Sequence, residues 1–146
     1  GRNVCLNFAL TTLTNWKAAM SRRTDLALVI VPFAVSGVIH LVKPEVFEPI
    51  VPKSLPRKRD LVLASGAAEL ACASLVAVPR TRRLGGFLSA GLLAAIFPAN
   101  VQMAADVVSS KKAPVWYKAG VLARLPMQWP LIRAALRTGA KGAVTD

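Results

Sequence analysis

The sequence predicts an all-α integral membrane protein, a bundle of four transmembrane helices. Hydrophobic residues make up 54% of the 146 residues, which is more than a soluble domain of this length can bury. These residues gather in four runs, each close to the roughly 20 residues that a helix needs to cross a bilayer. Charged and proline-rich segments separate the runs. The length and the pattern together predict one membrane domain.

The first two spans are expected at residues 25–42 and 61–79. Beyond its charged first residue, the first run has only two polar side chains, Ser36 and His40. In the second run, Glu69 and two serines interrupt an otherwise apolar stretch. A short loop rich in arginine follows the second run, as expected for a tight connection at the membrane surface.

The third span is expected at residues 84–105, which are apolar until Asn100 and Gln102. Small residues at four-residue spacing on this span predict a face where a neighbouring helix can approach closely. These small residues are Gly86, Ala90 and Ala94.

The fourth span, residues 115–136, is the least apolar of the four. Arg124, Gln128 and Arg133 interrupt it, and two prolines each remove a backbone donor. Neighbouring helices in a bundle can satisfy the carbonyls that the prolines leave free. We therefore expect a kinked helix that depends on its neighbours for insertion.

The segment between the first two spans, residues 43–60, contains four prolines and cannot form one regular helix. It also carries apolar side chains, among them Phe47, Val51 and Leu55. As a hypothesis, this segment lies along the membrane surface and covers one end of the bundle.

The chain divides into three parts by composition. Residues 1–24 are expected to form an extension outside the bundle, and Met20 resembles a natural start. Residues 25–138 form the membrane domain, and residues 139–146 form a C-terminal tail. The extension lacks the apolar core of a secretory signal, so the first span itself is expected to direct insertion.

The charge is strongly basic, with 19 Lys and Arg against seven Asp and Glu and a net charge of +12. The charges lie between the apolar runs, which favours anionic lipid head groups as partners over nucleic acid. With four spans, the termini share a side with the loop from Arg80 to Arg83. Counting the nearby ends of the fourth span, that side carries ten Lys and Arg against eight on the opposite side. The positive-inside rule therefore favours cytoplasmic termini.

Cysteine and histidine are too few for common redox or metal sites. Cys5 and Cys72 do not form a C-x-x-C pair, and His40 is the one histidine of the chain. A metal or haem centre built from several histidines is therefore excluded. Cys72 lies in an apolar run, where a small buried hydrophobic residue is the expected role.

Ionisable and amide side chains inside the spans require an explanation, because a charge at bilayer depth costs about 2.5–3.5 kcal/mol. At a rise of about 1.5 Å per residue, the groups lie about 3 to 13 Å from the side of the two longer loops. They are predicted to form one intramembrane polar cluster in that half of the membrane. The cluster consists of His40, Glu69, Asn100, Gln102, Arg124 and Gln128.

Glu69 and Arg124 fall at matching depth, about 12 and 13 Å, and are therefore predicted to form an ion pair. Gln128 lies one helical turn below Arg124 and is placed to share the pair. Two roles stay open for this cluster. It either binds a ligand, or it fixes helix packing and register alone.

Four short segments, in order along the chain, resemble the DoxX-like family of small four-helix membrane proteins. The segments are Ser36–His40 leading to Lys43-Pro44, Ser65–Leu70, Phe97–Met103 and Arg124–Gln128. The resemblance extends from about residue 25 to residue 136. It implies a four-helix bundle in the plasma membrane.

The same resemblance implies a setting for function. Some DoxX-like proteins are small membrane subunits of quinone-linked oxidoreductases, and others belong to oxidative-stress or thiol-metabolising complexes. His40, Glu69, Asn100 and Arg124 match polar positions of the family's pattern, which carry no agreed catalytic role. The missing C-x-x-C argues against electron transfer through thiols of this chain.

Three functions remain open from the sequence. The first is a non-catalytic membrane subunit whose polar cluster holds a quinone or lipid headgroup beside a redox partner protein. The second is an intramembrane enzyme acting on an isoprenoid or lipid, with Glu69 and His40 exchanging protons. The third is a structural assembly partner for other membrane proteins, homo-oligomers included. The first and third, jointly a non-catalytic subunit, are favoured over the enzyme by the family resemblance.

Overall fold

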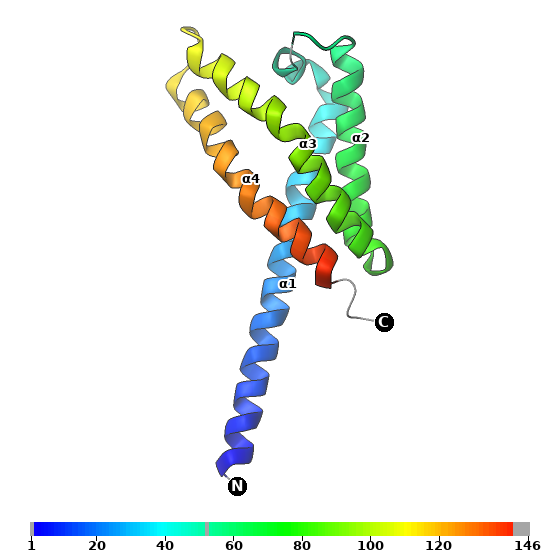
Figure 1. The fold of residues 1–146 in the computed structure, drawn as a ribbon, viewed down its shortest axis with the longest axis vertical. Helices are drawn as coiled ribbons and strands as arrows, with labels where there is room; N and C mark the ends of the chain where they lie inside the picture. The colour runs from blue at the N-terminus through cyan, green and yellow to red at the C-terminus, as the bar shows by residue number, and fades with distance from the viewer. Residues whose placement is uncertain (1, 52, 142–146) are drawn as a thin grey trace.

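The computed structural model describes residues 2–51 and 53–141, which form four long helices and no strand (Figure 1). The long helices are α1 (Arg2–Val42), α2 (Lys58–Ala77), α3 (Arg82–Ser109) and α4 (Val115–Lys141). Short 3-10 helices in the connections are η1 (Pro44–Val46), η2 (Glu48–Ile50) and η3 (Pro79–Thr81). The predicted all-α bundle is confirmed.

Prolines set two of the helix ends. α1 ends at Val42 and α2 at Ala77, each two residues before a proline, whose ring disfavours helical geometry in the residue that precedes it. The Arg82 side chain then closes α2 by donating to two of its last carbonyls. Its Nε lies 2.9 Å from the Val76 oxygen and its Nη2 lies 3.1 Å from the Ala77 oxygen.

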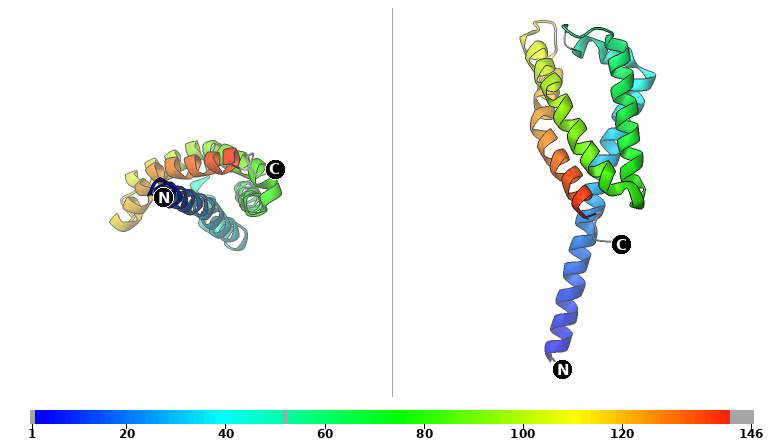
Figure 2. Two further views of the ribbon diagram at one scale, coloured as in Figure 1. Left: turned by 90° about the horizontal axis from the view of Figure 1, so that it is seen from below. Right: turned by 45° about the vertical axis from the view of Figure 1, so that its right-hand side comes forward.

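The first and last helices are longer than the sequence predicted. α1 begins at Arg2 rather than residue 25, because neither glycine nor proline occurs from residue 2 to residue 31 to stop it. Its N-terminal half projects from the bundle (Figures 1 and 2), and residues 10–20 are exposed. α4 continues past residue 136 to Lys141. Residues 142–146 of the expected tail lie outside the described residues.

The helices pack as two pairs, α1 with α2 and α3 with α4, which meet at one end of the bundle (Figure 2). Two clusters of buried side chains join the pairs, one around Val29 and Val76 and the other around Phe33 and Leu93. Towards the other end the buried cluster around Met103 contains residues of α3 and α4 alone. The two pairs therefore diverge there.

Small residues allow the closest helix contact. A Cβ added at Gly86 would lie 2.5 Å from the backbone nitrogen of Gly139, so α3 and α4 touch backbone to backbone. Gly86 and Ala90 of the predicted small-residue face are buried, whereas Ala94 is exposed. The predicted close approach is therefore correct for the first part of this face only.

An ion pair ties α1 to α4 at the end where the pairs meet. Arg137 Nη2 lies 2.9 Å from Asp25 Oδ1, and Asp25 is 3% exposed. In the sequence, Asp25 is only the charged first residue of the first predicted span. Its partner lies 112 residues further along the chain, so no local pattern could reveal the contact.

Three helical stretches are long and apolar enough to cross a membrane: Leu10–Val42, Lys58–Ala77 and Pro79–Ser109. These lengths and compositions fit a membrane-embedded protein. α4, the expected fourth span, is not among them, because Arg124, Gln128 and Arg133 lower its mean hydropathy. α4 nevertheless packs along α3 (Figure 1).

Candidate functional site

The α1–α2 pair holds a buried histidine–glutamate contact. His40 Nδ1 lies 3.2 Å from Glu69 Oε2, and both side chains are buried, at 8% and 4% exposure. An ionised carboxylate can only accept, so Nδ1 donates the hydrogen bond when Glu69 is ionised. The ring of Phe47, from the segment that follows α1, stacks on the imidazole at 3.9 Å between centroids. The histidine ring is therefore fixed on two sides.

Two glycines bring this pair together. A Cβ on Gly37 would lie 2.9 Å from the carbonyl oxygen of Gly66, and one on Gly66 would lie 2.6 Å from the His40 Cβ. Without side chains at these positions, the backbones of α1 and α2 approach closely enough for a short imidazole–carboxylate contact.

The contact does not form a nucleophilic serine site. Ser36 Oγ lies 3.3 Å from the same Nδ1 that contacts Glu69. A Ser–His–acid nucleophile needs the serine on one ring nitrogen and the carboxylate on the other. With Nδ1 engaged, Nε2 is the nitrogen left for a ligand, since no hydrogen bond joins it to the described residues.

The α3–α4 pair presents an amide chain and a guanidinium. Asn100 Nδ2 donates to Gln128 Oε1 at 3.0 Å, and Gln128 Nε2 donates to the Leu93 carbonyl. These bonds engage both the oxygen and the nitrogen of the Gln128 amide and fix the orientation of Asn100. Arg124, one turn before Gln128, makes no hydrogen bond or ion pair with the described part of the chain.

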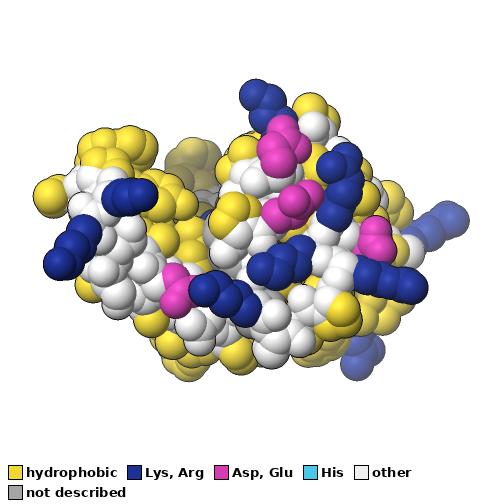
Figure 3. All heavy atoms as spheres, turned by 90° about the horizontal axis from the view of Figure 1, so that it is seen from above, with side chains coloured by type: hydrophobic (Ala, Val, Ile, Leu, Met, Phe, Trp, Pro, Cys, Tyr) yellow, Lys and Arg dark blue, Asp and Glu magenta, His cyan; other side chains and the backbone are white. Residues whose placement is uncertain are grey.

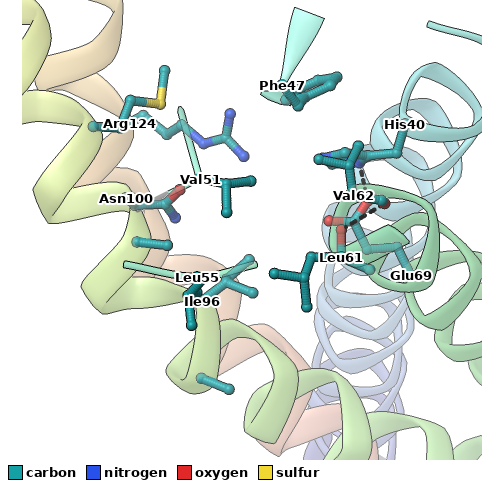
Figure 4. Close-up of a pocket in the computed structure, with 14 residues that line it drawn as sticks. His40, Phe47, Val51, Leu55, Leu61, Val62, Glu69, Ile96, Asn100 and Arg124 are labelled. Carbon is teal, nitrogen blue, oxygen red and sulfur yellow. Dashed lines mark hydrogen bonds and ion pairs between the residues drawn. The ribbon is translucent and has the colours of Figure 1, made fainter. Parts of the chain in front are cut away.

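A cavity of about 350 Å³ separates these two walls where the helix pairs diverge. Figure 4 shows Arg124 and Asn100 on one wall and His40 and Glu69 on the opposite wall. A second, smaller cavity of about 160 Å³ lies beside the first and shares Glu69, Asn100 and Arg124 with it, and we treat the two as parts of one site. Glu69, Asn100 and Arg124 thus lie between two neighbouring spaces.

The remaining walls of the larger cavity are mostly apolar. They are formed by Phe47, Val51, Leu55, Leu61, Val62, Ala95, Ile96, Ala99 and Met103, with Ser65 as one further polar residue. Such a space, apolar with a few convergent polar groups, is typical of a site for a small amphiphilic molecule. No group of three His, Cys, Asp or Glu that could hold a metal ion occurs among the described residues.

A model for a domain of unknown function, DUF8561, matches residues 28–139. The chain belongs to this family. No curated protein and no solved structure matches the chain. The DUF8561 match includes every residue that lines the cavity, from His40 to Arg124. It neither supports nor opposes the expected resemblance to DoxX-like proteins, which stays a prediction.

The structure corrects one predicted contact within the DUF8561 domain. Glu69 pairs with His40, and no ion pair joins it to Arg124 among the described residues. Glu69 and Arg124 do line the same cavity, as their matching depth implies. Depth along a helix is set by residue number, whereas contact also depends on the direction in which each helix faces its neighbours.

Gln102 does not belong with the other five polar residues. It is exposed, and its Nε2 donates to Asp106 Oδ1 one turn later at 3.1 Å. It lines neither part of the cavity. Gln102 is two residues from Asn100, and residues at that spacing do not face the same side of a helix.

The apolar cover of the cavity comes from the proline-rich segment. Phe47, Val51 and Leu55 line the cavity, and η1 and η2 contact the helices beneath them. This agrees with the hypothesis that the segment covers one end of the bundle. The sequence signal was the apolar residues among the prolines, but it did not show that they form part of a site.

Proposed function

We propose that this chain is a four-span protein of the plasma membrane whose cavity holds the polar headgroup of a quinone or lipid. It acts as a non-catalytic subunit of an oxidoreductase or stress-response complex. The observation that carries the proposal is the cavity itself. Arg124 and Asn100 face His40 and Glu69 across a space whose other walls are mostly apolar.

The cavity suits an amphiphile for simple physical reasons. Its apolar side chains favour a hydrocarbon or isoprenoid chain, since burying such surface gains about 25 cal/mol per Å². Arg124 and Asn100 carry N–H groups that can donate to carbonyl or headgroup oxygens. Groups fixed by neighbours, such as His40 between Glu69 and Phe47, lose little freedom when a ligand binds.

Membrane embedding through four spans is supported by the outer surface of the helices. Large apolar side chains such as Phe87, Phe97 and Val101 on α3 are 42–46% exposed, as expected for residues that face lipid. Trp116 and Tyr117 lie at the start of α4, and aromatic residues favour the membrane–water interface. α4 packs along α3, so a bilayer that holds α3 also surrounds α4.

The subunit role rests on the resemblance to DoxX-like proteins, which is an argument by analogy. It implies a redox partner protein that carries the catalytic centre. Anionic lipid head groups are the second expected partner, because basic side chains are plentiful at both ends of the bundle.

Native mass spectrometry of protein extracted gently from its own membrane tests the proposed site. We expect a quinone or lipid bound to the wild type and lost in Ala99→Phe, which fills the cavity without changing a charged group. Ala94→Phe is the matched control, because Ala94 is exposed on the same helix and lines neither part of the cavity. A wild-type protein without ligand, or a ligand retained equally in both variants, would contradict the proposal.

One observation favours the enzyme as a second candidate. Glu69 contacts His40, the other residue to which this candidate gives an acid–base role, and forms no ion pair with Arg124 among the described residues. A carboxylate that orients an imidazole is a common arrangement for general acid–base catalysis. If the chain is an enzyme acting on a lipid or isoprenoid, Glu69→Gln must change the lipid composition of the membrane. An unchanged composition rules this candidate out.

A further inference from the structure

Arg124 is a cation without a countercharge in the described part of the chain. Glu69 is the one acidic residue that lines either part of the cavity, and it is held on the opposite wall by His40. The next acidic residue on the neighbouring helix is Asp106, which binds Gln102 and lines neither space. The guanidinium therefore faces the cavity with its donors unused (Figure 4).

The position of Arg124 makes this arrangement costly in a membrane. It is the tenth residue of α4, so it lies about 13 Å from the start of that helix at about 1.5 Å per residue. Charged side chains at such depth face the bundle interior or a cavity, and they pair with an opposite charge or with backbone carbonyls. Since no acidic side chain of the described residues pairs with Arg124, a bound anion would supply the missing opposite charge.

We propose that the cavity is selective for an amphiphile with an anionic headgroup, a carboxylate or a phosphate, that pairs with Arg124. This inference rests on the proposed function and narrows its ligand class from quinone or lipid to an acidic lipid. The planar guanidinium fits both headgroups, because its paired N–H groups match two oxygens of a carboxylate or phosphate.

Two neighbouring features agree with an anion at this place. Asn100 faces the cavity from the same wall as Arg124, and Gln128 fixes its amide orientation. The apolar residues Val51, Leu55 and Ile96 lie beside these groups and suit a hydrocarbon tail (Figure 4). A headgroup at Arg124 and a tail along the apolar walls would together occupy the cavity.

The test compares three ligands that share one chain and differ in headgroup: oleyl alcohol, oleate and oleyl phosphate. Each is titrated against the full-length protein in a non-ionic detergent and followed by native mass spectrometry. At least one of the two anions is expected to bind the wild type ten-fold or more tightly than the alcohol, which corresponds to about 1.4 kcal/mol. The preferred anion tells a carboxylate site from a phosphate site.

Variants assign the preference to Arg124. Arg124→Gln is expected to bind all three ligands alike, and Arg124→Lys is expected to keep part of the preference because it keeps the charge. Arg133→Gln is the control, because Arg133 is an exposed arginine on the same helix that lines neither space, and it is expected to keep the full preference.

Three results separate the possible failures. Equal binding of the three ligands by the wild type would overturn the anion selectivity and leave an amphiphile site intact. An anion preference that persists in Arg124→Gln would also overturn it. Loss of all binding in the wild type, together with no native ligand, would contradict the proposed function itself. If Arg124→Gln does not fold, the wild-type headgroup comparison and Arg124→Lys still decide the question.

Discussion

At the scale of single residues, His40 is the most constrained group of the site. Glu69 fixes its Nδ1, Phe47 covers its ring, and Gly66 lies against its Cβ. A ring held in this way presents Nε2 in one direction only. The histidine is therefore pre-organised whether it binds a ligand or moves a proton.

This contact predicts an energetic coupling that a double-mutant cycle measures. For Glu69→Ala and His40→Ala, the coupling in the free energy of unfolding is expected to be about 1 kcal/mol or more, because the side chains touch. For Glu69→Ala and Arg124→Ala it is expected to stay below about 0.5 kcal/mol. The measurement is denaturant unfolding in detergent micelles. A larger coupling to Arg124 than to His40 would restore the pair predicted from depth alone.

The residues of the site were largely predictable, and their contacts were not. Polar residues are rare inside apolar runs, so His40, Glu69, Asn100 and Arg124 could be found from composition, and they line one cavity. Their partners depend on how each helix is rotated about its axis, which hydropathy does not encode. One signal was present, since Gly37 and Gly66 each stand three residues before His40 and Glu69. Small residues at matching depth on two neighbouring helices allow the two backbones to pack closely at that depth.

At the scale of helices, the α3–α4 contact depends on two glycines. A methyl group on Gly86 would meet the Gly139 nitrogen at 2.5 Å and the Ala135 oxygen at 2.7 Å. Both neighbours are backbone atoms and cannot swing away, so the helices would have to separate. The cavity lies further along the same helix pair, and separation here would also shift Arg124 and Asn100 relative to α1 and α2.

Two alanine substitutions on α3 test this contact. Gly86→Ala is expected to destabilise the protein by about 1–3 kcal/mol through overpacking. Gly91→Ala is the matched control, because nothing lies within 4 Å of its added Cβ, and alanine favours a helix over glycine. The melting temperature in detergent is therefore expected to fall for Gly86→Ala and to stay or rise for Gly91→Ala. Equal shifts in both variants would contradict the backbone contact.

The sequence predicted the positions of three helices well but not the residue at which α1 begins. Three of the expected spans agree with α2, α3 and α4 to within about five residues, because prolines and charged clusters mark the boundaries. α1 shows the limit of this reasoning. Arg22 and Arg23 mark the start of the apolar run, but they do not mark the start of the helix. No glycine or proline between residue 2 and these arginines interrupts α1.

At the scale of the whole molecule, the two ends of the bundle differ in charge. The end that bears the longer loops mixes basic residues with acidic ones, and Figure 3 shows both kinds on this face. The acidic residues in these loops and at the adjoining helix ends are Glu45, Glu48, Asp60 and Asp106. The opposite end gathers arginines, with Asp25 as the one acidic residue in the described part. The cavity lies near the mixed end, beneath the proline-rich segment, so the proposed ligand headgroup would lie in that half of the membrane.

This asymmetry predicts the orientation, and two reporters on one background measure it. Arginines in short loops favour the cytoplasm, so the α2–α3 loop and both chain ends are expected inside. Ser54→Cys, in the proline-rich segment and in a chain without its two native cysteines, should react with an impermeant maleimide on intact bacterial cells. If the C-terminus is cytoplasmic, a fluorescent protein fused after residue 146 should fluoresce, and alkaline phosphatase fused at the same place should be inactive. Ser54 and the C-terminus on the same side would mean that α4 does not cross the membrane. Ser54 in the cytoplasm and the C-terminus outside would agree with four spans. The half of the membrane that holds the cavity would then be the cytoplasmic half.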